Sequence, residues 1–196
     1  MSKRIIVATG NAGKMKEFKE VLGDLDADIV SMKDAGIEED VEENGTTFEE
    51  NALIKARAIA KKATDAIVLA DDSGLEIDYL NKEPGIYSAR YLGHDTSYDY
   101  KNKVILEKLK DVPKEQRSAR FVCALAAVFP DGKEVVKRAT IEGEIGYEIA
   151  GENGFGYDPI FFVPEYGVTT AELTMEQKNA ISHRGKALRM IKEELV

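Results

Sequence analysis

The stretch ARFVCALAAVFPDGKEVVKRATIEG (119–143) consists of two long β-rich runs around one short turn. The first run covers 119–129, the turn 130–133 and the second run 134–143. Short connections that contain glycine join antiparallel neighbours, so this pattern predicts a long β-hairpin. The middle of the hairpin is apolar enough to be buried. We therefore expect these two paired strands to form the backbone of the fold.

Strands and loops alternate on the N-terminal side of this hairpin. Short apolar runs predict strands at 4–9, 27–31, 66–70 and 75–79. The strand at 75–79 is expected to lie next to the strand at 66–70. Acidic or turn-forming residues predict loops at 34–43 and 81–93. On the C-terminal side, a glycine-rich loop is expected at 151–159 and a strand at 160–163.

Helices are predicted between these segments from apolar residues at helical spacing. The first carries Met15, Phe18, Val21 and Leu22, and the second begins at Thr47, which forms a capping box with Glu50. Further helices are expected over 96–110, with Thr96 as the cap, and over 174–194. The order of all these elements predicts a mixed α/β fold.

The bulk composition limits the classes of protein that this chain can belong to. The 196 residues are 43% hydrophobic, enough for one substantial core, so we expect one domain over 1–196 that can divide into two lobes. The net charge of −9 argues against nucleic-acid partners and against an anionic membrane surface. No apolar run is long enough for a membrane span or a secretory signal, so a cytoplasmic location is expected. The single cysteine, Cys123, is expected to be a buried structural thiol.

The segment ATGNAGK (8–14) links the first strand to the first helix and places Lys14 at the helix N-terminus. Free backbone N–H groups, the helix dipole and an ammonium group converge there, which suits a polyphosphate. The segment is not GxxxxGK[ST], because Met15 replaces the hydroxyl residue that would hold magnesium. The alternative is a Gly/Asn turn that caps an ordinary helix.

Asp71 and Asp72 follow the apolar run 66–70, at what is expected to be a strand end. Crowded carboxylates there can share a hard divalent cation with phosphates and water. The alternative is a turn that begins with aspartate. Glu42 and Glu43 are further acids, although most carboxylates of that region are expected to be solvated.

Two later segments carry residues suited to reading a base. In GFGYDP (154–159), Phe155 between glycines can stack on a nucleobase, or it can pack against the following strand. In SHRG (182–185), Arg184 offers a fork of donors, with Lys178 nearby in sequence. The alternative for this segment is a surface helix cap at Ser182. No role is assigned to His94.

Six segments together resemble the inosine/xanthosine triphosphate pyrophosphatase family of non-canonical purine nucleoside triphosphate pyrophosphatases (XTP/dITP diphosphatases). The resemblance covers nearly the whole chain, and the blocks occur in the family's order. They are ATGNAGK (8–14), EENGTTFEENALIKA (42–56), ADDSGLEID (70–78), PGIYSARY (84–91), GFGYDPIF (154–161) and SHRGKAL (182–188).

The resemblance implies an enzyme that hydrolyses the α–β phosphoanhydride bond of ITP, dITP or XTP, giving a monophosphate and pyrophosphate and cleaning the nucleotide pool. It also implies an elongated, bilobed domain with a long central mixed β-sheet flanked by helices, and a substrate cleft between the lobes. The implied cofactor is Mg²⁺, and the implied assembly is a homodimer.

The family pattern also assigns roles to individual residues. Asp72 is implied as general base and metal ligand, with Glu42 as the first choice for a second ligand and Asp71 or Glu43 as alternatives. The residues implied in substrate binding are Thr9, Gly10, Asn11, Ala12, Gly13, Lys14, Lys55, Ser73, Phe155, Gly156, Tyr157, Asp158, Lys178, His183 and Arg184.

Two other functions stay open at the level of sequence. A pyrophosphatase of the related Maf type would share the phosphate chemistry but read pyrimidine or modified bases, and the ATGN and SHR segments disfavour it. A nucleotide-binding sensor would keep the pocket without catalysis, which the intact Asp71/Asp72 pair disfavours.

Overall fold

The hairpin predicted from 119–143 is confirmed in the structure, a computed structural model that describes residues 3–196. Its strands are β4 (Ser118–Val128) and β5 (Glu134–Ile145), adjacent in the sheet. The turn closes with hydrogen bonds from the Phe129 amide to the Lys133 carbonyl and from the Gly132 amide to the Phe129 carbonyl, both 2.9 Å long. Gly132 has a φ of +89°, which glycine adopts without strain.

Within residues 3–196, seven strands form a mixed sheet in the order β2-β1-β3-β4-β5-β6-β7. The remaining strands are β1 (Lys3–Val7), β2 (Ala27–Ser31), β3 (Ile67–Ile77), β6 (Phe161–Val163) and β7 (Val168–Thr169). β1 pairs in parallel with β2 and with β3, whereas β6 pairs antiparallel with β5 and β7. The mixed α/β fold class is therefore confirmed.

The α-helices lie close to their predicted positions. They are α1 (Ala12–Leu22), α2 (Phe48–Ala60), α3 (Tyr98–Lys108), α4 (Met175–Ile181) and α5 (His183–Leu195). Thr47 caps α2 by accepting the Glu50 amide, but the Glu50 carboxylate accepts from the Thr46 amide, so the predicted reciprocal box is shifted by one residue. The cap of α3 is Ser97 and not Thr96.

The chain divides into two compact units, each with its own apolar core. Unit 1 consists of the chain up to Asp72, Cys123–Ala139 and His183–Val196; unit 2 consists of Ser73–Val122 and Thr140–Ser182. The expectation of one domain with two lobes stays a prediction. The predicted elongated shape and substrate cleft stay predictions.

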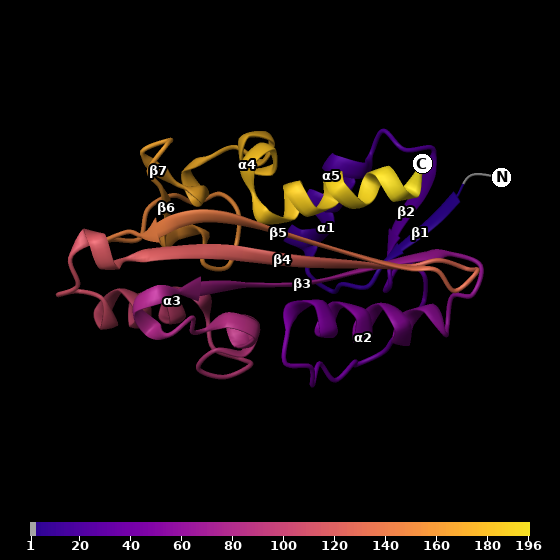
Figure 1. The fold of residues 1–196 in the computed structure, drawn as a ribbon, viewed down its shortest axis with the longest axis horizontal. Helices are drawn as coiled ribbons and strands as arrows, with labels where there is room; N and C mark the ends of the chain where they lie inside the picture. The colour runs from indigo at the N-terminus through magenta and orange to yellow at the C-terminus, as the bar shows by residue number, and fades with distance from the viewer. Residues whose placement is uncertain (1–2) are drawn as a thin grey trace. The chain divides into compact units, whose positions relative to one another are not determined.

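In unit 1, helices cover both faces of the strands (Figure 1): α2 lies on one side of β3, and α1 and α5 lie on the other. Phe18, Leu69 and Leu188 belong to its core, all with no exposed surface. Cys123 is buried in the same core, and burial raises the pKa of its thiol to about 12. A structural role for this thiol is therefore confirmed.

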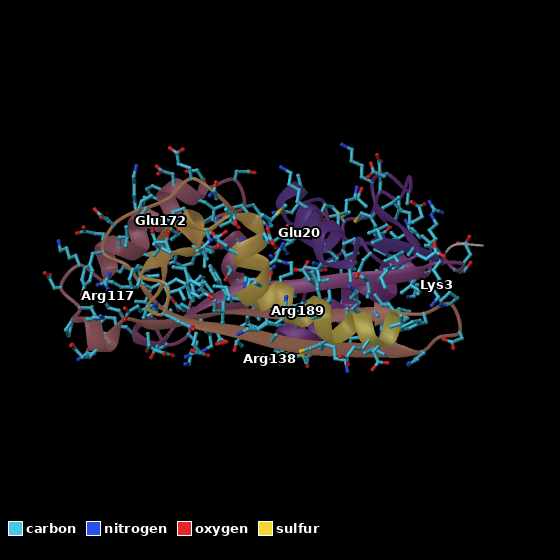
Figure 2. All side chains as sticks on the ribbon, turned by 90° about the horizontal axis from the view of Figure 1, so that it is seen from above. Lys3, Glu20, Arg117, Arg138, Glu172 and Arg189 are labelled. Carbon is cyan, nitrogen blue, oxygen red and sulfur yellow. The ribbon has the colours of Figure 1, made fainter. Side chains whose placement is uncertain are left out.

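In unit 2, α3 contributes Ile105 and Leu109 to a core shared with Leu75 and Phe161. Arg117, labelled in Figure 2, is also buried in this unit, and its guanidinium donates to main-chain carbonyls, among them those of Ile145 and Gly146. The carbonyl dipoles compensate the buried charge of Arg117. Its hydrogen bonds to Ile145 and Gly146 hold the end of β5 in place.

Besides the two caps corrected above, two expectations about strands and loops were wrong. β3 does not end before Asp71 but runs to Ile77, so both aspartates lie in mid-strand and 75–79 continues β3 instead of forming an adjacent strand. The expected loop 81–93 contains a 3-10 helix, η2 (Gly85–Arg90). The helical sequence expected over 174–194 forms two helices, α4 and α5, which are separated at Ser182, whose backbone is extended. No helix found between residues 3 and 196 is long and apolar enough to cross a membrane.

Candidate active site

The segment ATGNAGK forms a capped helix N-terminus in unit 1. Thr9 Oγ1 accepts the Asn11 amide at 3.1 Å, and Asn11 Oδ1 accepts the Lys14 amide at 3.0 Å. Ala12 and Gly13 begin α1, and Gly10, Asn11 and Ala12 are exposed. The predicted helix start is thus confirmed. Because Gly10 and Ala12 are exposed beside this helix N-terminus, the segment can accept an anion.

Asp71 is the centre of a group of buried charges in unit 1. Its carboxylate lies 3.1 Å from Lys14 Nζ and 3.3 Å from Arg184 Nη2, and its side chain is 1% exposed. Burial acts to raise the pKa of Asp71, but the charges of Lys14, Arg184 and Lys55 outweigh it and hold the pKa well below its usual range. Asp71 is therefore a permanent counter-ion that fixes the direction of Lys14 and Arg184.

Arg184 and Lys55 connect this group to other elements of unit 1. Arg184 also pairs with Glu17 of α1, and both side chains are almost completely buried. Lys55 of α2 donates to the Asp71 carbonyl at 2.8 Å and pairs with Glu43. We call Lys14, Glu17, Lys55, Asp71, Asp72 and Arg184 the charged cluster.

The pKa of Asp72 is shifted in the opposite direction from that of Asp71. Successive residues of a strand point to opposite faces, so its carboxyl points away from that of Asp71. Burial, together with the negative charge of Glu43, raises the pKa of Asp72 to about 7, against the effects of Lys55 and Lys14. Within the part of the chain that the structure describes, its Oδ2 is buried and has no hydrogen-bond partner. A buried carboxyl that titrates near neutrality is typical of a catalytic base.

The acidic loop before α2 approaches this carboxyl through Glu43. Glu43 is half-buried and paired with Lys55, whereas Glu42, the first choice from sequence, is exposed. Among the described residues 3–196, no three acidic, histidine or cysteine side chains are grouped so as to hold a metal ion. A cation beside Asp72 would therefore need oxygens from substrate or water, as magnesium commonly does.

In unit 2, the side chain of Asp158 holds the turn GFGYD (154–158) in its conformation by hydrogen bonds. Its buried carboxylate accepts the Phe155 amide at 2.9 Å, the Thr170 hydroxyl at 2.7 Å and Lys178 Nζ at 2.7 Å. Lys178 Nζ also lies 4.7 Å from the centroid of the half-buried Phe155 ring. The turn thus fixes an aromatic ring and an ammonium group next to each other.

Tyr157 anchors the same turn through its side chain. Its hydroxyl donates to the Ser88 carbonyl of η2 at 2.6 Å, and its ring is 5% exposed. Burial also raises the pKa of this phenol above its usual range. Any ligand contact at this position would fall to the backbone. We call Phe155, Gly156, Tyr157, Asp158 and Lys178 the aromatic cluster.

The segment SHRG is not a surface helix cap, because Ser182, His183 and Arg184 are each at most 5% exposed. His183 and Arg184 open α5 in unit 1, and Arg184 joins the charged cluster. Ser73 follows Asp72 within β3 and is half-buried. His94 is exposed, and the structure suggests no role for it.

Sequence reasoning missed three residues that support the two clusters. Glu17 follows Lys14 by three residues, so helical spacing could have placed both on one face of α1. Tyr98 and Asn102 of α3 contact the aromatic cluster across a long separation in sequence, and no local signal reveals that contact.

Comparison with known proteins relates the whole chain to one family. A model described as the Ham1 family matches residues 5–194. The chain is 50% identical to a dITP/XTP pyrophosphatase of Clostridium perfringens, covering 98% of this chain and 97% of that protein. It is 49% identical to the dITP/XTP pyrophosphatase of Bacillus subtilis, with the same coverage of each chain.

Solved structures give the same relation. The Staphylococcus aureus Ham1 protein matches with a TM-score of 0.87 and 44% identity over 98% of each chain. A nucleoside-triphosphatase or dITP/XTP pyrophosphatase of Mycobacterium abscessus matches with a TM-score of 0.74 and 44% identity, covering 96% of this chain and 98% of the other.

Proposed function

The chain belongs to the Ham1 family, and from that premise we propose that it hydrolyses the non-canonical purine nucleoside triphosphates dITP, XTP and ITP to monophosphate and pyrophosphate. The observation that carries the proposal is its 50% identity, over 98% of its length, to a dITP/XTP pyrophosphatase. Such a hydrolase removes deaminated purines from the nucleotide pool.

The charged cluster supplies the groups for phosphate chemistry. The backbone amides of the exposed residues Gly10 and Ala12 and the ammonium group of Lys14 bind the triphosphate. Asp71 orients Lys14 by its ion pair, so the cation is placed before the substrate arrives. Lys55 is fixed in the same way by Glu43 and the Asp71 carbonyl.

Asp72 is the general base that takes a proton from the attacking water. With a pKa of about 7, a large fraction of Asp72 is deprotonated at neutral pH. The deprotonated carboxylate is also a stronger base than an aspartate with the ordinary pKa. The unpartnered Asp72 Oδ2 fits a divalent cation, and Asp72 with Glu43 or Glu42 would hold Mg²⁺. When bound, Mg²⁺ neutralises charge on the pyrophosphate leaving group.

The aromatic cluster recognises the purine. Phe155 stacks on the base, and its position is fixed by the bonds from Asp158 to the turn and to Lys178. Hypoxanthine and xanthine carry an oxygen acceptor at position 6, which backbone N–H donors can satisfy. Adenine presents an amino donor there, and each unpaired buried group costs roughly 1–3 kcal/mol.

Three further properties belong to the same proposal, and the first two rest on the family resemblance stated above. They are the use of Mg²⁺ as the cofactor, assembly as a homodimer and a cytoplasmic location. Equilibrium sedimentation of the full chain tests the second directly, because a monomer at micromolar concentration would contradict it.

The deciding experiment incubates the protein with Mg²⁺ and a panel of triphosphates and identifies the products. We expect dITP and XTP to give monophosphate and pyrophosphate, with kcat/KM far above that for dATP or dGTP. Release of orthophosphate would contradict the bond assigned. Preference for pyrimidine or modified triphosphates would favour the Maf type, and tight binding without turnover would favour a sensor.

A further inference from the structure

Asn102 of α3 is a buried amide that holds the turn carrying Phe155. Its side chain is 2% exposed, and its Nδ2 donates to the Gly156 carbonyl at 3.1 Å. Gly156 has a φ of +64° and Gly154 a φ of +70°, values that glycine adopts without strain but that it leaves as easily, so the turn depends on outside contacts to keep one conformation. A bond to the middle of such a turn restricts the position of the ring beside it.

Tyr98 lies one helical turn before Asn102 on α3, and its side chain is also next to Gly156. Its ring atoms lie 3.7–4.0 Å from the point where a Cβ at Gly156 would stand. The ring also meets that of Tyr157 edge-on, with 5.1 Å between centroids. One face of α3 therefore packs against both Gly156 and Tyr157, and all these residues lie in unit 2.

The same face of α3 is tied to η2, which receives the Tyr157 hydroxyl. Lys101 is 1% exposed and donates to the Ala89 carbonyl at 2.7 Å. Tyr157 donates to the adjacent Ser88 carbonyl. The turn is consequently fixed at Asp158 by its own carboxylate and at Gly156 and Tyr157 by α3 and η2.

We propose that Asn102 is a positioning residue for base selectivity, which sets the place of the Phe155 ring by holding the Gly156 carbonyl. The proposal rests on the function proposed above and adds a residue to it. Asn102 does not touch substrate in this role. An amide suits the position because it donates a hydrogen bond without placing a charge in a buried environment.

The Asn102 Oδ1 atom supports a role beyond packing. It is buried and has no hydrogen-bond partner among residues 3–196. A side chain chosen for packing alone would not leave a polar atom unpaired, since leucine has nearly the same shape. The single bond from Nδ2 to Gly156 is therefore the feature that leucine would remove.

The test compares Asn102→Leu and Tyr98→Leu with the control Ile105→Ala, all in the full chain. Ile105 is a fully buried residue of the same helix whose side chain lies in the core, so its truncation weakens α3 without removing the Gly156 bond. We expect Asn102→Leu to raise KM for dITP about three- to fivefold, less than removal of the Phe155 ring itself, and to lower kcat less than about twofold. The ratio of kcat/KM for dITP over dATP should fall as well.

A second readout follows the turn directly by amide hydrogen exchange of the segment 153–158. Exchange should accelerate in Asn102→Leu, and to a smaller extent in Tyr98→Leu, but not in Ile105→Ala. Tyr98 is partly exposed, so its variant keeps the test available if Asn102→Leu fails to fold.

Unchanged exchange and unchanged KM in a folded Asn102→Leu protein would overturn the proposal, as would equal changes in Ile105→Ala. If the wild-type protein does not cleave dITP, the proposed function fails. The exchange measurement still decides in that case whether Asn102 holds the turn.

Discussion

The charged cluster of unit 1 and the aromatic cluster of unit 2 are built on different physical principles. The charged cluster buries three acids and an arginine, and two of these acids, Glu17 and Asp71, are each paired with Arg184. The aromatic cluster contains one buried ion pair, Lys178 with Asp158, and otherwise relies on rings and neutral hydrogen bonds. The difference shows that nearby charges set the pKa of a reactive carboxyl, whereas a rigid turn sets the position of the Phe155 ring.

Asp71 and Asp72, adjacent residues of the charged cluster, show that their surroundings can shift the pKa of two identical side chains in opposite directions. Asp71 has a lowered pKa because three cations surround it, and Asp72 has a raised pKa because burial and Glu43 disfavour its charge. Two carboxyls with opposite shifts take different roles, one as a fixed counter-ion and the other as a titrating base.

The largest expected effect concerns catalysis in the charged cluster. Asp72→Asn should lower kcat for dITP by at least about 10³-fold, because the amide cannot accept the proton of water at neutral pH. KM should change little, since the Lys14 and Phe155 contacts remain. The measurement is pyrophosphate release, with exposed Asp99→Asn as the matched control. Activity near that of the control would remove Asp72 from its role.

The next effect compares the buried ion pairs of the two clusters. Arg184→Met should lower the free energy of unfolding by about 3–5 kcal/mol, because Asp71 and Glu17 both lose a partner. Lys178→Met should cost about 1–3 kcal/mol, since Asp158 keeps the Phe155 amide and the Thr170 hydroxyl. Urea unfolding measures both. Equal losses would show that the clusters do not differ in their dependence on charge.

A smaller effect is the pH dependence of stability in the metal-free protein, measured with EDTA present. The carboxyl of Asp72 has an ordinary pKa of 3.8 and a folded value of about 7, so the folded state holds the extra proton between these values. Stability is therefore lost as the pH rises through this range, by on the order of 2–4 kcal/mol. Asp72→Asn lacks this loss.

The stability of Asp72→Asn relative to wild type should accordingly increase between about pH 4 and pH 8 and then level off. Asp71 shows the opposite sign, because its lowered pKa contributes stability above its ordinary value of 3.8 that disappears only on acidification. A constant difference between Asp72→Asn and wild type across this range would contradict the raised pKa.

The smallest effect tests the aromatic cluster alone. Phe155→Leu should raise KM for dITP about five- to tenfold through lost stacking and should leave kcat nearly unchanged. Phe155→Tyr keeps the ring and serves as the matched control. A loss in kcat with unchanged KM would instead assign Phe155 to the chemical step and weaken the distinction between the clusters.

Much of the fold was predictable because its signals are local. The hairpin of β4 and β5 follows from two apolar runs around PDGK, and the start of α1 follows from Asn11 as cap. Strand β3 was misjudged because two adjacent aspartates resemble a turn in any local pattern. They are tolerated in mid-strand because Asp71 meets cations from α1 and α5, one of them 113 residues away.

The sequence by itself determined the classes of residue available, the cap of α2 at Thr47, the hairpin and the six blocks that relate the chain to its family. Only the tertiary structure decided that Asp71 is a counter-ion, that Asp72 titrates near neutrality, that Tyr157 is an anchor and that Asn102 holds the turn of Phe155. The physical reason is that propensities and caps act over a few residues. A pKa or the rigidity of a turn, in contrast, depends on burial and on charges supplied by distant parts of the chain.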